Sequence, residues 1–458
     1  MSALTKMGLT DLVAKVVGWA QGDEQVEAYA AHSRDAEVEV YQGGIETLST
    51  AETDGVGIRV VLPGDDGARQ GFAYTGALDE ASLLACLNEA RDNAGFGTPD
   101  PFLGLATADG VEPEVLDLYR PELASFPTEA KIEMALELER LVRAGDPRIR
   151  SLRSASYGDG MLEVAIATTT GIARSYRRSG CSVVAFAIAG DADDTQTGFG
   201  YSVGRAADEL DIHKAAAMAV ERATRLLGST KPASRRTAVV LDPYVTSSLL
   251  GILGGTLNAE SVLKGRSLFA DRVGQQVAVE SFDLVDEPTN PLAYGATPVD
   301  AEGLATRRLP LIDKGVLQGF VHNSVTARRA GGDARSTGSA VRAGFKSTPG
   351  VGCRALTVRP GSQSAQEILQ SVGNGVLIQS ISGIHSGVNT ISGDFSVGAE
   401  GLVIRDGQVA EPIREFTIAS SIQRMLMEVL AVGNDLEWLP GGSAGVTLAI
   451  DGMSLSGS

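Results

Sequence analysis

Residues 38–62 read VEVYQGGIETLSTAETDGVGIRVVL, and this stretch indicates how the first half of the chain folds. Valine, isoleucine and threonine recur in short runs, some of them alternating with polar residues, which is typical of strands with one buried face. Polar or Gly-rich turns divide these runs, one of them at Asp54 between the runs 45–53 and 55–62, and similar runs occupy 26–32 and 70–75. The pattern predicts an antiparallel meander of short strands.

Helical patterns flank this meander. Apolar residues recur at helical spacing within 9–20, and amphipathic helices are expected at 79–94, where Asp79 is a candidate N-cap, and at 128–145. A third amphipathic stretch ends near residue 229. The segment 95–127 contains five prolines and is predicted to be a long surface connection.

A domain boundary is expected at 229–236, a polar stretch that contains a proline and precedes a new strand. It divides the chain of 458 residues into an N-terminal domain over 1–228 and a C-terminal domain over 237–458. The second half is strand-rich, with a buried small-residue helix at 243–259. Further helices are expected at 363–372 and 419–431. Strands come in runs instead of alternating with helices, so the fold class is α+β in both domains.

Composition excludes several classes of protein. The formal net charge of −18 argues against a nucleic-acid surface, because a DNA binder offsets phosphate charge with clustered Lys and Arg. The uncharged stretch 244–259 is too short and too rich in Ser, Thr and Gly for a membrane span. Cys86, Cys181 and Cys353 are scattered, which fits reduced thiols in a cytoplasmic protein.

Motifs for catalysis are incomplete. Each of the four histidines stands alone, without the second histidine at helical spacing that zinc peptidases use; they are His32, His213, His322 and His385. A G-x-S-x-G string surrounds Ser202 and another surrounds Ser443. No histidine follows Ser443, and no buried central strand is expected before Ser202, so neither matches a nucleophile elbow. The sequence therefore predicts no catalytic residue, bound metal or cofactor in this chain.

The loop GIHSGVNTISGDFSVG (383–398) places a histidine beside a serine. Its glycines predict tight turns with positive φ or close backbone approach, and Asn389 and Asp394 are suited to bonding neighbouring backbone in such turns. Four residues of this loop are candidates for contact with a substrate or a partner: His385, Ser386, Asn389 and Asp394.

Four stretches of the second half are distinctive in this order: 265–289, the D-x-E-G turn of 299–320, the G-x-H-S-G-V-N loop of 383–409 and 413–438. With these motifs, nearly the whole chain resembles the TldD/TldE (PmbA) family, once described as modulators of DNA gyrase and now as peptidase subunits. The TldD branch carries H-E-x-x-x-H on a helix and a cysteine after a late G-N-D. Here the corresponding segment, 247–266, contains Glu260 but no histidine, and no cysteine follows GND.

This resemblance to the TldE branch implies a non-catalytic subunit. It would pair with a TldD-type zinc peptidase that holds the zinc, shape a chamber and help to cleave unfolded or extended peptides. Without that partner the chain could form a homodimer.

Two alternatives remain open. The chain could be a self-sufficient hydrolase, either metal-dependent through unfamiliar ligands or serine-based through Ser386 or Ser202. It could also be a regulatory binder of a DNA topoisomerase.

Overall fold

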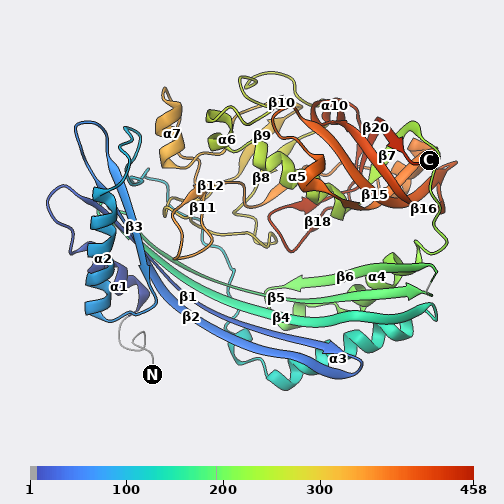
Figure 1. Ribbon diagram of the computed structural model, residues 1–458, viewed down its shortest axis with the longest axis horizontal. Helices are drawn as coiled ribbons and strands as arrows, with labels where there is room; N and C mark the ends of the chain where they lie inside the picture. Colours follow the sequence, from blue (N-terminus) through green and yellow to red (C-terminus); the bar gives the residue numbers. More distant parts are fainter. Residues whose placement is uncertain (1–7, 192) are drawn as a thin grey trace.

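A long antiparallel sheet forms the N-terminal half of the computed structural model, which describes residues 8–191 and 193–458. Its strand order is β3-β2-β1-β4-β5-β6. The strands are β1 (Gln25–Tyr41), β2 (Gly44–Leu62), β3 (Arg69–Thr75), β4 (Ile149–Thr168), β5 (Ala173–Gly190) and β6 (Thr195–Gly204). Figure 1 shows the sheet curving, with the C-terminal half lying on its concave side.

The strands are longer than the sequence predicts. The expected turn near Asp54 does not exist, because β2 runs through it and pairs with β1 from Gln25 to Tyr41. Asp54 and Gly55 continue the strand, since Gly55 and Gly57 lie against Phe345 of the C-terminal half. A Cβ atom on Gly57 would stand 2.2 Å from the Phe345 carbonyl oxygen. These glycines allow close packing instead of a turn.

Helices cover the convex face of the sheet in two groups. The helices are α1 (Leu9–Val17), α2 (Glu80–Gly95), α3 (Thr128–Gly145) and α4 (Ile212–Thr224). The first two enclose an apolar core with β1 and β2, and the other two enclose a core with β4 and β5. The side chain of Asp79 caps α2 by accepting a hydrogen bond from the Ser82 amide at 3.0 Å, as predicted.

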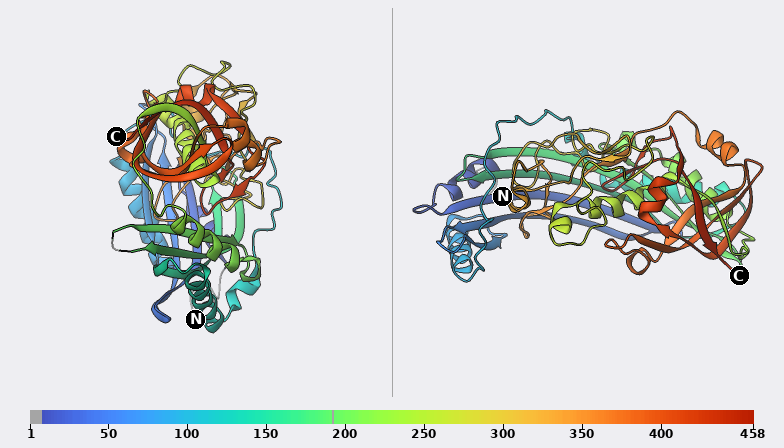
Figure 2. Two further views of the ribbon diagram at one scale, coloured as in Figure 1. Left: turned by 90° about the vertical axis from the view of Figure 1, so that its right-hand side faces the viewer. Right: turned by 90° about the horizontal axis from the view of Figure 1, so that it is seen from above.

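A barrel-like mixed sheet forms the C-terminal half, with strand order β16-β15-β14-β7-β20-β17 and a further β16–β20 pairing (Figure 2). Only β7 and β14 pair in parallel within this sheet. The strands are β7 (Arg235–Leu241), β14 (Gly375–Ser382), β15 (Asp394–Arg405), β16 (Gln408–Ser421), β17 (Val429–Val432) and β20 (Leu448–Ser456). The fold is α+β, as expected.

Helix α5 (Pro243–Thr256) fills this half, and its leucines pack in one core with the barrel strands. Shorter helices are α6 (Ala259–Leu263), α7 (Ser324–Ala330), α8 (Ala365–Val372), α9 (Ile384–Gly387) and α10 (Ile422–Met427). A separate four-stranded sheet contains β8 (Leu284–Asp286), β9 (Leu309–Asp313), β10 (Val316–Leu317) and β13 (Leu356–Val358). Two further pairs are β11 (Ala340–Val341) with β12 (Gly350–Val351), and β18 (Glu437–Trp438) with β19 (Ala444–Gly445). The helix predicted over 419–431 is wrong at both ends, because β16 extends to Ser421 and β17 begins at Val429.

A buried ionic network joins the two halves. The Glu27 carboxylate on β1 accepts hydrogen bonds from Arg59 on β2 at 2.5 Å and from Arg342 of the C-terminal half at 2.6 Å. Arg342 also lies 4.3 Å from the ring centroid of Tyr29. These side chains are almost fully buried, so the network constrains how the halves pack.

The division of the chain at 229–236 stays a prediction, and the domain expected over 1–228 includes residues 1–7 and 192, which lie outside the described residues. Strand β7 already begins at Arg235. Within the described part of the chain, every helix is too short or too polar to cross a bilayer.

Candidate functional site

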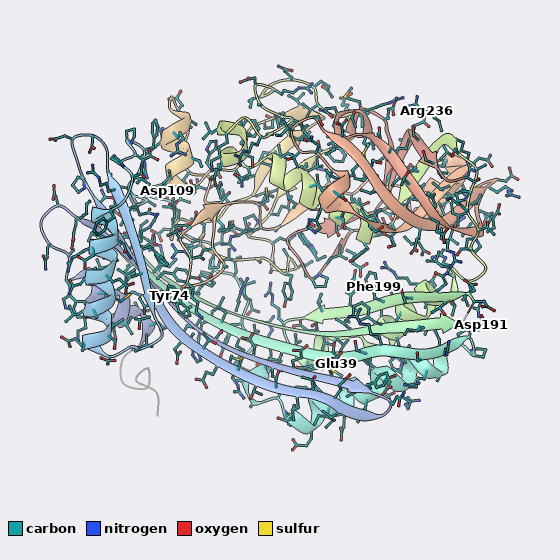
Figure 3. The ribbon with its side chains drawn as sticks, in the orientation of Figure 1. Glu39, Tyr74, Asp109, Asp191, Phe199 and Arg236 are labelled. Carbon is teal, nitrogen blue, oxygen red and sulfur yellow. The ribbon has the colours of Figure 1, made fainter. Side chains whose placement is uncertain are left out.

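A cavity of about 300 Å³ lies where the concave face of the N-terminal sheet meets the first turns of α5. Phe199 and Tyr201 of β6 line one side, and Tyr244 and Ser248 of α5 line the other, together with the loop 439–443. Figure 3 shows Phe199 on the side of β6 that faces the C-terminal half. The cavity therefore adjoins the segment 247–266, where the TldD branch is expected to carry its zinc ligands.

The polar side chains that line this cavity are hydroxyls, and those of its serines already have acceptors. Ser443 Oγ donates to the Ser247 carbonyl at 3.0 Å, and Ser247 Oγ donates to the Tyr244 carbonyl at 2.7 Å. The described residues that line the cavity include no imidazole, thiol or carboxylate. Zinc prefers exactly such nitrogen, sulfur and carboxylate ligands, so this donor set does not fit a zinc ion.

Asp242 holds the start of α5 in place. Its Oδ1 accepts a hydrogen bond from the Val245 amide at 2.8 Å, and its Oδ2 accepts one from Arg222 Nη2 at 3.2 Å. Burial raises the pKa of Asp242 to about 6, although the Arg222 guanidinium opposes the shift. The same guanidinium stacks on the rings of Phe199 and Tyr244, at 4.5 and 5.3 Å from their centroids. Asp242 is thus a helix cap and the ion-pair partner of Arg222.

Sequence reasoning missed the cluster of Arg222, Phe199 and Tyr244. The three residues come from α4, β6 and α5, and no motif links them in the chain. The only available signal was the proline at Pro243 after Asp242, which marks a capped helix start.

One group of side chains in residues 8–191 and 193–458 has the arrangement of a metal site, namely His32, Glu52 and Asp54. His32 Nδ1 lies 2.7 Å from Asp54 Oδ1 and 4.0 Å from Glu52 Oε1. His32 shares its face of β1 with Ala28 and Ala30, which pack under the helices of the convex side. The group therefore faces away from the α5 cavity.

The loop 383–398 has the turns that its glycines predict. Gly383 and Gly393 have φ values of 76° and 84°, and a Cβ atom on Gly387 would stand 1.9 Å from the Ser396 carbonyl oxygen. Asn389 Oδ1 accepts hydrogen bonds from the amides of Ile391 and Ser392, as expected. Asp394 differs from the prediction, because its carboxylate accepts from the Ser392 hydroxyl at 2.6 Å instead of from backbone.

The four candidate residues of this loop are exposed and do not form a catalytic group. Ser386 Oγ donates to the Gly383 carbonyl at 3.2 Å, so it bonds within its own turn. The loop also contacts the segment between α6 and β8, where the Leu268 amide donates to the Thr390 carbonyl at 3.0 Å. The role of His385, Ser386, Asn389 and Asp394 in contacting a substrate or partner stays a prediction.

Ser202 also lacks the setting of a nucleophile. It lies inside β6, paired with Val183, and its Oγ accepts a hydrogen bond from the Asp211 amide at 2.9 Å. A nucleophile elbow needs a sharp strand-to-helix turn at the serine, and β6 continues to Gly204.

The D-x-E-G turn is structural. Asp300 Oδ1 accepts from the amides of Glu302 and Leu304, and Glu302 Oε2 accepts from the amide and hydroxyl of Ser324. Burial, followed by the nearby Glu302 carboxylate, raises the pKa of Asp300 to about 7. Glu302 Oε1 lies 3.9 Å from Arg59, so the turn extends the network between the halves.

Comparisons with known proteins agree along almost the whole chain. Three sequence profiles match in order: PmbA/TldA metallopeptidase domain 1 over 26–94, its central domain over 121–227 and its C-terminal domain over 234–457. The metalloprotease PmbA of Escherichia coli O157:H7 is 26% identical over 433 residues, which is 94% of this chain and 92% of that protein. The PmbA homologue of Haemophilus influenzae is 26% identical over 420 residues, covering 90% and 88%.

Solved structures share the fold. The crystal structure of TldE from Thermococcus kodakarensis has a TM-score of 0.86 at 20% identity, covering 97% of this chain and 99% of that chain. A candidate modulator of a DNA gyrase from Thermotoga maritima has a TM-score of 0.88 at 24% identity, with the same coverage. The ordered match of all three domain profiles, on a chain with this fold, shows that the protein belongs to the PmbA/TldD metallopeptidase family.

Proposed function

We propose that this chain is the non-catalytic, TldE-like subunit of a two-subunit peptidase, in which a TldD-type partner holds the zinc ion. The observation that carries this proposal is the cavity at the start of α5. Its lining offers hydroxyls and aromatic rings at the place where the TldD branch would supply histidines and a cysteine. A chain that cannot bind zinc there cannot generate a zinc-bound hydroxide.

The proposed role is to shape the chamber in which the partner cleaves extended or unfolded peptides. The curved sheet and the barrel enclose cavities between them, and the buried network of Glu27, Arg59 and Arg342 holds these two walls in a constant arrangement. Two domains divided at 229–236, a cytoplasmic location and a homodimer in the absence of the partner belong to the same proposal.

Metal analysis and a peptidase assay test this function. The purified chain, a TldD-type subunit and their mixture are each assayed on an unstructured peptide, with and without the zinc chelator 1,10-phenanthroline. We expect no stoichiometric zinc and no cleavage by the chain alone, and chelator-sensitive cleavage by the mixture. The matched control is a partner with its ligand histidines changed to alanine, which should abolish cleavage without preventing assembly.

Chelator-sensitive cleavage by the chain alone would instead favour a self-sufficient hydrolase. The group of His32, Glu52 and Asp54 is the observation that supports this second candidate. His32→Ala would then abolish the cleavage by the isolated chain. If the isolated chain is inactive and the mixture is equally active with His32→Ala, this second candidate is wrong.

A further inference from the structure

A second cavity, of about 550 Å³, lies beside the α5 cavity and shares Phe199 with it. Its walls come from both halves of the chain. Arg153 of β4, Phe186 of β5 and Phe199 of β6 line it from the sheet, and Gln379 of β14 and Glu400 of β15 line it from the barrel. The volume is within the range of cavities that bind small ligands.

Two of these side chains occupy bulges in their strands. Leu152 and Ser154 of β4 pair with the consecutive residues Ala187 and Phe186 of β5, so Arg153 is an extra residue. Ile378 and Ser380 of β14 likewise pair with the consecutive residues Gly401 and Glu400 of β15, so Gln379 is an extra residue as well. A bulge turns a side chain out of the regular alternation, and bulges are common beside functional sites. Here two bulges, one in each half, bring a polar side chain to the same cavity.

The Gln379 side chain has no hydrogen-bond partner among the described residues. It is 6% exposed, and its Oε1 is buried without a donor. An amide in such a position costs free energy that a leucine or methionine would not. Because an amide both donates and accepts, it is complementary to a peptide group, which offers one N–H and one C=O.

An aromatic surface lies on the opposite wall of the cavity. The rings of Phe186 and Phe199 lie 6.2 Å apart, and Phe186 is 40% exposed although it is large and apolar. The Arg153 guanidinium lies 6.0 Å from the Phe186 ring, and the Arg222 guanidinium lies 4.5 Å from the Phe199 ring. An apolar surface flanked by cations is suited to an aromatic or aliphatic side chain.

We propose that this cavity binds an extended peptide segment, with Gln379 pairing to one peptide group and an aromatic or aliphatic side chain of the peptide lying on Phe186 and Phe199. This inference deepens the proposed function and rests on it for the class of ligand. It assigns a peptide-binding site to the subunit itself, adjacent to the α5 cavity.

Peptide binding to the isolated chain tests the inference. The probe is a fluorescein-labelled heptapeptide, Gly-Ser-Gly-Phe-Gly-Ser-Gly, and the comparison peptide has alanine in place of phenylalanine. Fluorescence anisotropy should show saturable binding of the first peptide and at least about tenfold weaker binding of the second. Phe199→Leu should weaken binding of the phenylalanine peptide, whereas the control Phe96→Ala, at an aromatic residue that is 93% exposed, should leave it unchanged.

Gln379→Met separates a binding role from a structural one. It removes both polar atoms and keeps an unbranched side chain of similar length, so we expect Tm to stay equal or rise. Binding of the phenylalanine peptide should fall by about two- to tenfold, which is the usual effect of losing one neutral hydrogen bond. A stable variant with reduced binding is the result that supports the inference.

Three results would overturn it. They are no saturable binding below about 1 mM, equal binding of the two peptides, and a Gln379→Met variant that loses Tm but binds as the unchanged chain does. Each is independent of the zinc and mixing assays, because the probe is bound without the partner. If the chain supports cleavage when mixed with a TldD-type subunit but does not bind the phenylalanine peptide, the proposed function stands and the proposed peptide site is wrong.

Discussion

The carboxyl group of Asp286 is buried, and among the described residues only one of its two oxygens has hydrogen-bond partners. Its Oδ1 accepts hydrogen bonds from the amides of Arg354 and Ala355 at 3.0 and 2.7 Å, and its Oδ2 is buried without a partner among the residues that the structure describes. Burial raises the pKa of Asp286 to about 6, although the two amides oppose the shift. Because the folded protein holds the proton more tightly than the unfolded chain, protonated Asp286 contributes to the free energy of unfolding. This contribution is complete below the unfolded pKa of 3.8 and is lost as pH rises through about 6.

Asp286→Asn removes the charge and keeps the acceptor. Relative to the unchanged chain, the variant should gain stability as pH rises, from about 1.6 kcal/mol at pH 5, which is already above the unfolded pKa of 3.8, to about 3 kcal/mol at pH 8 for a shift to about 6. Urea unfolding of both proteins at the two pH values measures this difference. An equal difference at pH 5 and pH 8 would contradict the assigned pKa shift.

His385 is exposed on α9, and we expect its substitution to leave the fold intact. In the complex reconstituted with a TldD-type subunit, His385→Ala should assemble and cleave an unstructured peptide at close to the unchanged rate. Loss of cleavage with normal assembly and Tm would show that His385 belongs to the site. Ile391→Ala serves as the control in the same loop, because its side chain is 57% exposed and it is not one of the four candidate residues.

Strand β2 illustrates how packing between elements overrides local sequence signals. A Cβ on Gly57 would collide with backbone of the C-terminal half, 2.2 Å from the Phe345 carbonyl oxygen. Gly158 on β4 is a matched control, because a Cβ there would meet its nearest atom at 3.8 Å. There is therefore no room for a Cβ atom at Gly57 but enough room for one at Gly158, although both glycines lie inside strands.

Gly57→Ala should destabilise the chain by about 1–3 kcal/mol through overpacking, whereas Gly158→Ala should change its stability by much less. Urea unfolding followed by circular dichroism measures both. Equal effects of the two substitutions would mean that loss of glycine flexibility, and not the contact with Phe345, determines the result.

The expected turn near Asp54 and the expected helix over 419–431 failed for related reasons. Asp-Gly is a strong local turn signal, but Gly55 pairs with Ala31 inside the sheet and lies under the Phe345 ring. In the second case only 422–427 is helical, because the residues on either side pair with barrel strands. Long-range pairing outweighed local propensity in both. Where no such partner intervenes, as at the N-cap of α2, the sequence prediction is confirmed.

At the scale of the whole molecule, Arg342 of the C-terminal half binds the Glu27 carboxylate of the N-terminal sheet, which is 1% exposed. The Arg342 and Arg59 guanidiniums outweigh the effect of burial and hold the pKa of Glu27 below its usual value. Removing one of two partners leaves a buried charge only partly compensated. Lys214 and Glu437 form an exposed pair between the same halves and provide a comparison.

Arg342→Met should therefore lower the free energy of unfolding by about 3–5 kcal/mol, and Lys214→Met by about 1 kcal/mol or less. The two tryptophans permit a sharper readout, since Trp19 lies in the N-terminal half and Trp438 in the C-terminal half. In Trp19→Phe and Trp438→Phe backgrounds, the fluorescence transitions should coincide for the unchanged network. They should separate with Arg342→Met, and coincident transitions in that variant would show that other contacts couple the halves.

The sequence by itself determined the α+β class, the N-cap of α2, the glycine turns of 383–398 and the family, because each depends on neighbouring residues or on ordered motifs. The joining of short runs into long strands, the network of Glu27, Arg59 and Arg342, and the cavities around Phe199 depended on tertiary structure. Their residues are far apart in the chain, and burial brings them together. No local pattern encodes whether Gln379 finds a hydrogen-bond partner, since that depends on which walls surround it.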